Sequence, residues 1–313
     1  MLNQINVSIN EILLEQPQFT LNVDKKYIRR IFTMNIMVTG ATGEYGNYAL
    51  QYLEKVMPKS NLYALVRNPQ NATKIEQMGI NVRIGDYANL DSLLSAFHGI
   101  DRLLFVSTSI PKIQKNVVDA AKVNGITYIA YTSIYRPELN KFGLELNHRQ
   151  TEKWIEESGI RHTFLRNDWY LEVNQAMFNL AAQTQQFPLL NKSGILSYAL
   201  KREYAEAGAK IILADNYGPV ANLAGKPFTY QQLAEATESA LGQKLNIQSV
   251  SKDQFNSIMR QAKISPQFQQ AVALYQEYSL DPQNGAAEAN SSEFENILGH
   301  PLTSLPNAIK SLL

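Results

Sequence analysis

The 313-residue chain contains no cysteine. It therefore forms no disulfide and offers no thiolate to a metal ion or to a substrate, and this composition suits a reducing compartment. Histidine is scarce as well, with four residues at positions 98, 148, 162 and 300, so the sequence shows no His-rich metal cluster. We expect a cytoplasmic protein without a metal centre.

An excess of one charge and long apolar runs are also missing. Lys and Arg number 29 against 28 Asp and Glu, a net charge of +1, which provides no broad field to attract nucleic acid or an anionic membrane. No segment reaches the roughly 18 uninterrupted apolar residues of a membrane helix. Since 45% of the residues are hydrophobic, the composition predicts a globular protein with a substantial core that neither binds nucleic acid nor inserts into a membrane.

The most informative positive feature is an apolar strand, Ile36–Val38, that runs into three glycines spaced three apart. Gly40 lets the chain leave the strand sharply, Gly43 lets backbone N–H groups approach a pyrophosphate, and Gly46 lets the next helix pack near the strand. That helix, at about 45–56, points its positive amino end at the phosphates. We expect a dinucleotide to bind the loop residues Gly40, Ala41, Thr42, Gly43, Glu44, Tyr45 and Gly46.

The context of this loop decides between a cofactor site and an ordinary tight turn. A second apolar strand at 62–66 completes a strand–helix–strand unit of about 30 residues, which favours the cofactor site. A P-loop is excluded because no Gly-Lys-Ser/Thr ending is present. NAD sites usually place Asp or Glu after the second strand, whereas this chain has Arg67, whose guanidinium can bind a 2′-phosphate. Arg67 favours NADP(H) over NAD(H), the alternative being a solvated loop cation.

Strands and helices continue to alternate along the chain as far as residue 166. This count is typical of an α/β fold with a Rossmann doubly wound parallel sheet. We predict a Rossmann domain over 34–166, followed over 167–313 by a mixed segment that returns to the sheet and forms a smaller α/β substrate lobe. The further predicted strands lie at 80–86, 102–106, 128–131 and 162–166, and the further helices at 70–78, 90–97, 112–124 and 147–158.

Polar residues follow the predicted strands at the edge where a doubly wound sheet binds its ligand. Asp86 and Tyr87 end the third strand and could border the adenine, but Asp86 could equally cap the next turn. The fourth and fifth strands end in hydroxyl groups, which we expect to line the nicotinamide side. These residues are Ser107, Thr108, Ser109, Thr132 and Ser133.

Several segments of the chain form a distinctive combination. They are 39–46, 65–69, 129–133, His148 with 151–153, and 165–170. Together they resemble the NmrA-like atypical short-chain dehydrogenases, and within them the NAD(P)H:quinone oxidoreductases of type 2. The likeness runs from about residue 34 to residue 313. It implies an NADPH-binding Rossmann domain, a smaller carboxyl-terminal lobe, and a cleft between them where a quinone meets the nicotinamide.

One departure from ordinary short-chain dehydrogenases bears on the chemistry. Those enzymes carry a Tyr four residues before a Lys, and the Tyr gives its proton to a carbonyl oxygen. Lys153 has Arg149 at that position, and arginine is no acid near neutral pH. A quinone tolerates the loss, because the hydroquinone anion resembles a phenolate with a pKa of about 10. We therefore expect orientation-driven hydride transfer from NADPH to a small-molecule quinone.

The resemblance also assigns roles to individual residues. Lys153 would hold the ribose hydroxyls, Asn167 would orient the substrate carbonyl, and Trp169 and Tyr170 would offer flat surfaces to the ring. The alternatives are a solvated helix lysine for Lys153 and core packing for Trp169 and Tyr170. Two other functions stay open, namely an NADP(H)-binding redox sensor without turnover and a reductase of dyes or azo compounds. The oligomeric state is open as well, a homo-oligomer included.

The first 33 residues fall outside this resemblance. Met1–Thr33 lack the charged-then-apolar pattern of a signal peptide, and their basic residues come late. The first strand begins just after Met34, where a nucleotide-binding domain normally begins. We interpret the segment as an extension translated from an upstream start, and we expect a chain that begins at Met34 to fold and to bind its cofactor.

Overall fold

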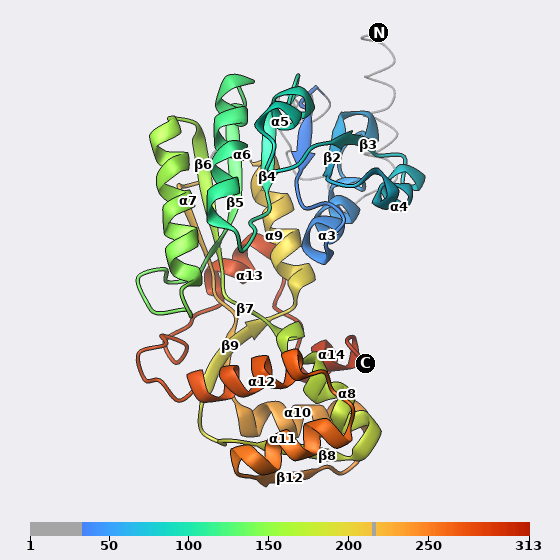
Figure 1. Cartoon of the computed structure of the whole chain (residues 1–313), viewed down its shortest axis with the longest axis vertical. Coiled ribbons are helices and arrows are strands. Elements are labelled where there is room, and N and C mark those ends of the chain that lie inside the picture. Colours follow the sequence, from blue (N-terminus) through green and yellow to red (C-terminus); the bar gives the residue numbers. More distant parts are fainter. Residues whose placement is uncertain (1–32, 215–216) are drawn as a thin grey trace.

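The computed structural model describes residues 33–214 and 217–313. The extension expected over residues 1–33 therefore lies outside the described residues, apart from Thr33. Figure 1 shows an elongated molecule in which a larger lobe, built on the main sheet, stands above a smaller lobe rich in helices. Across the two described ranges, no helix is long and apolar enough to cross a membrane.

Seven parallel strands form the main sheet of the larger lobe. They are β1 (Ile36–Val38), β2 (Leu62–Val66), β3 (Asn81–Ile84), β4 (Arg102–Phe105), β5 (Tyr128–Ile134), β6 (Arg161–Asn167) and β10 (Val220–Leu223). Their order is β10-β6-β5-β4-β1-β2-β3, so the chain winds outward from β1 in both directions. The inner strands β1, β4 and β5 are buried along their whole length and mainly apolar, because helices cover both faces of the sheet. The predicted Rossmann-like α/β fold is confirmed.

The helices of the larger lobe form a layer on each face of this sheet (Figure 1). They are α3 (Glu44–Leu53), α4 (Thr73–Gln77), α5 (Leu90–Ala96), α6 (Pro111–Val123), α7 (Leu144–Ser158), α9 (Lys201–Leu213) and α13 (Ser292–Leu298), with short 3₁₀ turns η2 (Lys59–Asn61) and η3 (Pro69–Asn71). Helices α5, α6 and α7 share one apolar core with the sheet, and α3, α9 and α13 share the core on the other face. The carboxyl ends of the strands meet at the edge toward the smaller lobe.

Three segments of the chain, far apart in sequence, build the larger lobe, the last of them being α13. Helix α9 and strand β10 follow the first part of the smaller lobe in sequence, and β10 pairs with β6 at one edge of the sheet. The fully buried Arg102 of β4 donates from Nη1 to the carbonyls of Ile212 and Ala214, at 2.6 and 2.8 Å. These carbonyls end α9, so the guanidinium stabilises the negative end of that helix. The predicted domain boundary at residue 166 stays a prediction.

The smaller lobe packs helices around two short sheets. A three-stranded sheet has the order β11-β9-β7, and a two-stranded sheet pairs β12 with β8. Its core gathers aromatic and aliphatic side chains from most of these elements. The elements are β7 (Trp169–Tyr170), η4 (Leu171–Asn174), α8 (Gln175–Thr184), β8 (Gln186–Leu189), β9 (Ile195–Ala199), β11 (Lys226–Thr229), α10 (Tyr230–Leu241), β12 (Asn246–Ser249), α11 (Lys252–Gln261), α12 (Pro266–Tyr278) and α14 (Leu305–Lys310).

Candidate functional site

The glycine loop joins β1 to α3 at the carboxyl edge of the sheet. Gly40 has a φ of +58°, in the left-handed region, and a Cβ there would lie 3.1 Å from Cβ of Val106. At Gly46, in the first turn of α3, a Cβ would lie 2.8 Å from Cα of Ala41. The N–H of Gly43 donates to the Gly40 carbonyl at 3.0 Å and closes the turn. Backbone conformation at Gly40 and close approach at Gly46 therefore require glycine.

The outer side of this loop fits an anion. Thr42, Gly43 and Glu44 are exposed, and no side chain caps the first N–H groups of α3. These N–H groups and the helix dipole suit a pyrophosphate. The side chains of Ala41 and Tyr45 are instead buried, and the Tyr45 hydroxyl donates to the Tyr204 carbonyl at 3.1 Å. Tyr45 therefore anchors α3 to α9, so its expected cofactor contact is limited to the backbone.

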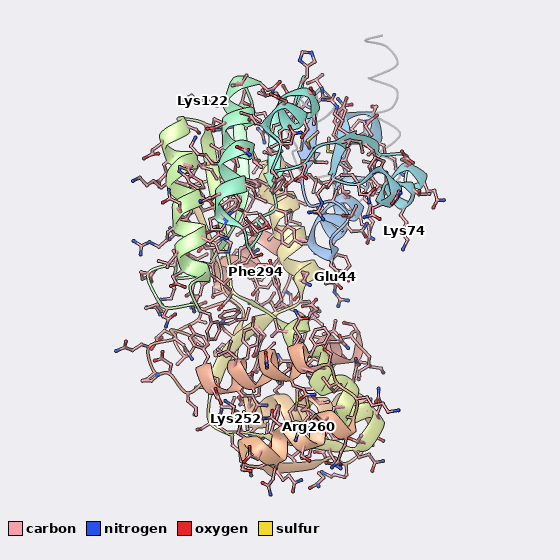
Figure 2. All side chains as sticks on the ribbon, in the orientation of Figure 1. Glu44, Lys74, Lys122, Lys252, Arg260 and Phe294 are labelled. Atoms are coloured by element: carbon pink, nitrogen blue, oxygen red, sulfur yellow. The ribbon has the colours of Figure 1, made fainter. Side chains whose placement is uncertain are left out.

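A lysine at the start of α9 lies at the amino end of α3. Lys201, the first residue of α9, forms an ion pair with Glu44. Figure 2 shows Glu44 at the end of α3 that faces the smaller lobe. The Lys201 ammonium also lies 5.4 Å from the ring centroid of Tyr170. Sequence reasoning missed this cation because it lies 157 residues from Glu44 and belongs to no motif.

Arg67 lies beside the glycine loop. It follows β2, whose Ala64 pairs with Val38 of β1, so the chain leaves β2 two residues beyond the end of β1. The side chain is exposed, and within the described part of the chain no ion-pair partner holds it. This placement agrees with both interpretations of Arg67, the ligand of a 2′-phosphate and the solvated loop cation. The contact to a 2′-phosphate stays a prediction.

Asp86 and Tyr87 follow β3 and stabilise the turns around the glycine loop. Oδ1 of Asp86 accepts from the Ala88 N–H at 2.9 Å, which is the expected turn cap. The Tyr87 hydroxyl donates to Thr39 Oγ1 and to the Val106 carbonyl, the latter at 2.9 Å. Tyr87 thus ties the start of the glycine loop to the end of β4. This support was not predicted, and contact of either residue with adenine stays a prediction.

The structure brings together only some of the predicted hydroxyl groups. Thr132 Oγ1 accepts from the Ser107 N–H at 2.8 Å and donates to Ser107 Oγ at 3.0 Å. Ser133 Oγ instead donates to Oε1 of the buried Glu152 at 2.6 Å, and Glu152 forms an ion pair with Arg166 at 2.8 Å. Ser107 and Thr132 therefore form one pair at the strand ends. Ser133 is directed into the protein.

A buried polar network supports the segment after β4. Gln114 Oε1 accepts from the Thr108 N–H at 3.1 Å, and Asn147 Nδ2 donates to the Thr108 carbonyl at 2.7 Å. Next to it, Nδ1 of His148 lies 3.1 Å from the Tyr131 hydroxyl. Burial lowers the pKa of His148 to about 4, so its imidazole is neutral at neutral pH. The network fixes the backbone of Thr108 and supplies no acid.

Lys153 lies on the exposed face of α7. The inward face of this helix carries Asn147, Thr151 and Glu152, which are all buried. The Lys153 side chain is 66% exposed and forms an ion pair with Glu157 at 3.8 Å, one helical turn away. This placement agrees with the alternative of a solvated helix lysine, and contact of Lys153 with the ribose stays a prediction.

The three predicted substrate residues pack against neighbouring side chains. Asn167 is 4% exposed, and its Nδ2 donates to the Tyr170 hydroxyl at 3.1 Å. Trp169 is 7% exposed, and its ring centroid lies 5.1 Å from that of Tyr275. Tyr170 packs edge-on against Tyr204, at 5.2 Å between centroids. Asn167 and Trp169 are thus buried and Tyr170 is half-buried, and contact of the three residues with a substrate stays a prediction.

A pocket of about 570 Å³ opens beside Ser109, between the amino ends of α6 and α7. Its lining combines apolar side chains with a hydroxyl and two amides, and none of these side chains is charged. Ser109 is the only predicted site residue that reaches it. The lining residues are Ser109, Pro111, Phe142, Gly143, Leu144, Leu146, Asn147 and Gln150. Over 33–214 and 217–313, no group of three or more acidic or histidine side chains could hold a metal ion.

Known proteins resemble this chain over most of its length. The NmrA-like family matches residues 33–298. Quinone oxidoreductase 2 of Escherichia coli (strain K12) is 33% identical over 284 residues, which cover 88% of this chain and 98% of that protein.

Solved structures agree with this match. The Citrobacter sp. triphenylmethane reductase complexed with NADP(H) gives a TM-score of 0.80 at 30% identity, and the match covers 90% of this chain and 100% of that chain. An NADPH-dependent quinone oxidoreductase from Escherichia coli, complexed with NADPH, gives a TM-score of 0.78 at 32% identity. This match covers 88% of this chain and 99% of that chain. The resemblance drawn from the sequence motifs is confirmed, and the chain belongs to the NmrA-like family.

Proposed function

We propose that the protein is an NADPH-dependent reductase that passes a hydride to a quinone. The glycine loop supports the cofactor, because its outer N–H groups are uncapped and its required glycines leave room for a pyrophosphate. The similar triphenylmethane reductase and quinone oxidoreductase were solved with NADP(H) and NADPH. When bound, NADPH supplies the hydride.

Two cations of this chain would favour the phosphorylated cofactor. Arg67 stands beside the loop with no ion-pair partner among residues 33–214 and 217–313, in a place suited to a 2′-phosphate. Lys201 brings a second positive charge to the amino end of α3, where it now pairs with Glu44. A pyrophosphate at this helix end could share that charge.

The observation that carries the choice of a quinone is the pocket beside Ser109. Its lining residue Ser109 follows Ser107 of the Ser107–Thr132 pair by two positions, and none of the lining side chains is charged. The nearest inward groups of α7 do not act as proton donors either, since His148 is neutral and Glu152 is held by Arg166. An acceptor whose reduced form leaves as a phenolate-like anion needs no such donor.

Rapid mixing tests this proposal directly. NADPH-loaded protein is mixed with 1,4-benzoquinone, with a cationic triphenylmethane dye, or with buffer, and absorbance at the nicotinamide band is followed. We expect the quinone to oxidise bound NADPH much faster than free NADPH. If bound NADPH is oxidised no faster than free NADPH by either acceptor, the protein binds the cofactor as a sensor and is no reductase. Faster oxidation by the dye alone would contradict the choice of a quinone.

A further inference from the structure

Phe142 is the aromatic ring that the structure exposes to the pocket. It lies in the loop between β5 and α7, lines the pocket, and is 37% exposed. Its φ is +60°, and Gly143 follows with a φ of +82°. The left-handed conformation is costly for a bulky side chain, so the surrounding structure must hold Phe142 in place.

The smaller lobe supports this ring from behind. The centroid of Phe142 lies 4.6 Å from that of Tyr278, 5.9 Å from that of Tyr275 and 6.0 Å from that of Trp169. The rings are tilted or edge-on, which are favourable arrangements for aromatic pairs. Trp169 thus contributes support beneath Phe142, while the ring surface that faces the pocket belongs to Phe142.

The residue before Phe142 anchors the loop to the smaller lobe. Lys141 is buried, and its Nζ donates to the Asn284 carbonyl at 2.9 Å. The same ammonium lies 5.6 Å from the Trp169 centroid and 5.7 Å from the Tyr278 centroid. Burial lowers the pKa of Lys141. A buried ammonium bound to a carbonyl and two ring faces is expensive, so its value lies in fixing the backbone next to Phe142.

A second link holds the same loop. The Tyr278 hydroxyl donates to the Asn140 carbonyl at 2.7 Å, and the Lys141 N–H donates to Glu145 Oε2 at 2.8 Å. Three consecutive residues of the loop are therefore each held by the smaller lobe. Asn140 is bound to α12, Lys141 is bound to the loop after α12, and Phe142 packs against the aromatic cluster. The position of the pocket wall is set by the smaller lobe.

We propose that Phe142 is the platform on which the ring of the acceptor stacks, and that Lys141 is the positioning residue that holds this platform from the smaller lobe. The proposal rests on the proposed reductase function and deepens it. Stacking on one phenyl face favours flat rings, and the exposed Gln150 offers an amide donor to a ring carbonyl at the pocket edge. A two-ring quinone covers more of the platform than a one-ring quinone.

Steady-state kinetics of the full chain test the platform. We expect Phe142→Ala to raise KM for 1,4-naphthoquinone about 5- to 10-fold, with a smaller rise for 1,4-benzoquinone and unchanged affinity for NADPH. Phe142→Trp restores KM because it restores the ring. Phe268→Ala, on the exposed surface of α12, is the matched control and leaves KM unchanged. An unchanged KM in folded Phe142→Ala, or equal rises for both quinones, overturns the platform.

The positioning role of Lys141 has its own readout. We expect Lys141→Met to raise KM for naphthoquinone with little change in kcat, and the double variant with Phe142→Ala to show no further rise, since both changes act through one ring. If Lys141→Met lowers the melting temperature and leaves KM unchanged, Lys141 has only a structural role. Additive rises in the double variant would also contradict the proposal.

A binding measurement separates this proposal from the proposed function. Naphthoquinone is titrated into the NADP⁺-loaded protein, in which no hydride can transfer, and quenching of tryptophan fluorescence is followed. Weaker binding to Phe142→Ala than to the Phe268→Ala control supports the platform even if rapid mixing shows no turnover. Equal binding to both variants, or no binding to the original chain, overturns the platform whatever the outcome for the reductase.

Discussion

Asp168 predicts an unusual pH dependence of stability. This carboxyl follows β6, is buried, and accepts a hydrogen bond from Ser197 Oγ. Burial raises its pKa to about 6, against 3.8 for the free side chain, and the attraction of Lys141 and Arg136 offsets burial only in part. The folded protein therefore holds this proton more tightly than the unfolded chain does.

The sign and size of the effect follow from that difference. Between about pH 4 and pH 6 the folded state binds more protons at Asp168 than the unfolded state, so this group makes the protein less stable as the pH rises. Each pH unit is worth about 1.4 kcal/mol. Keeping Asp168 ionised at pH 7 therefore costs roughly 3 kcal/mol relative to a carboxyl with an ordinary pKa.

The variant Asp168→Asn isolates this cost, because the amide oxygen still accepts from Ser197 but carries no charge. We expect its free energy of unfolding, relative to the original chain, to rise by about 2.4 kcal/mol between pH 4 and pH 7. Urea unfolding at several pH values measures the difference, in which other titrating groups cancel. Asp91→Asn, on the exposed surface of α5, is the control.

Two results would refute the reasoning. Parallel curves for the original chain and Asp168→Asn would mean that the carboxyl keeps an ordinary pKa in the folded protein. A gain in stability of the original chain over the variant as the pH rises would mean that Lys141 and Arg136 outweigh burial.

Three further predictions concern the glycine loop and the sheet. Arg67→Ala should weaken NADPH binding about 10- to 100-fold with little effect on NADH, measured by calorimetry, and equal losses would remove Arg67 from the 2′-phosphate site. Gly46→Ala should abolish NADPH binding, because its Cβ meets the loop backbone, while Gly218→Ala, which has open space, should bind normally. Arg102→Met should lower the free energy of unfolding by about 3 kcal/mol, since two α9 carbonyls lose their donor; an unchanged urea midpoint would contradict this.

The parts of the site that sequence reasoning found are local in the chain. The turn at Gly40 and the close approach at Gly46 depend on residues within a few positions of one another, so their spacing alone indicates the geometry. Arg67 is placed by the end of a strand that is apolar and easily recognised. The alternation of strands and helices predicted the Rossmann-like fold for the same reason.

The face of α7 could not be predicted in this way. Its inward side carries Asn147, His148, Thr151 and Glu152, so the apolar pattern that normally indicates the buried face of a helix is weak. The family resemblance assigned Lys153 to the ribose hydroxyls, and it carried no information on the exposed position that the structure gives this side chain. The polar partners that determine which face of α7 is buried, such as Gln114, come from another helix and leave no signal in the sequence of α7 itself.

Phe142 was missed for a different reason. Its left-handed backbone has no signature in an aromatic residue, and its neighbours Tyr275 and Tyr278 lie more than 130 positions along the chain. Trp169 and Tyr170 were singled out because they follow a recognisable motif, whereas the ring that reaches the pocket comes from a loop without one. Which member of an aromatic cluster is exposed depends on tertiary packing.

The late position of β10 and α9 in the chain matters during synthesis. When residue 167 leaves the ribosome, β6 still has an unpaired edge, and α3 still lacks the helix that covers it. Exposed strand edges and apolar faces invite association with other chains. About 56 more residues must emerge before β10 closes that edge, so at about 5–20 residues per second the growing chain is vulnerable for several seconds. The nascent protein should therefore depend on chaperones most strongly between these two lengths, which ribosome-bound chains stalled just after β6 has emerged and just after β10 has emerged would reveal.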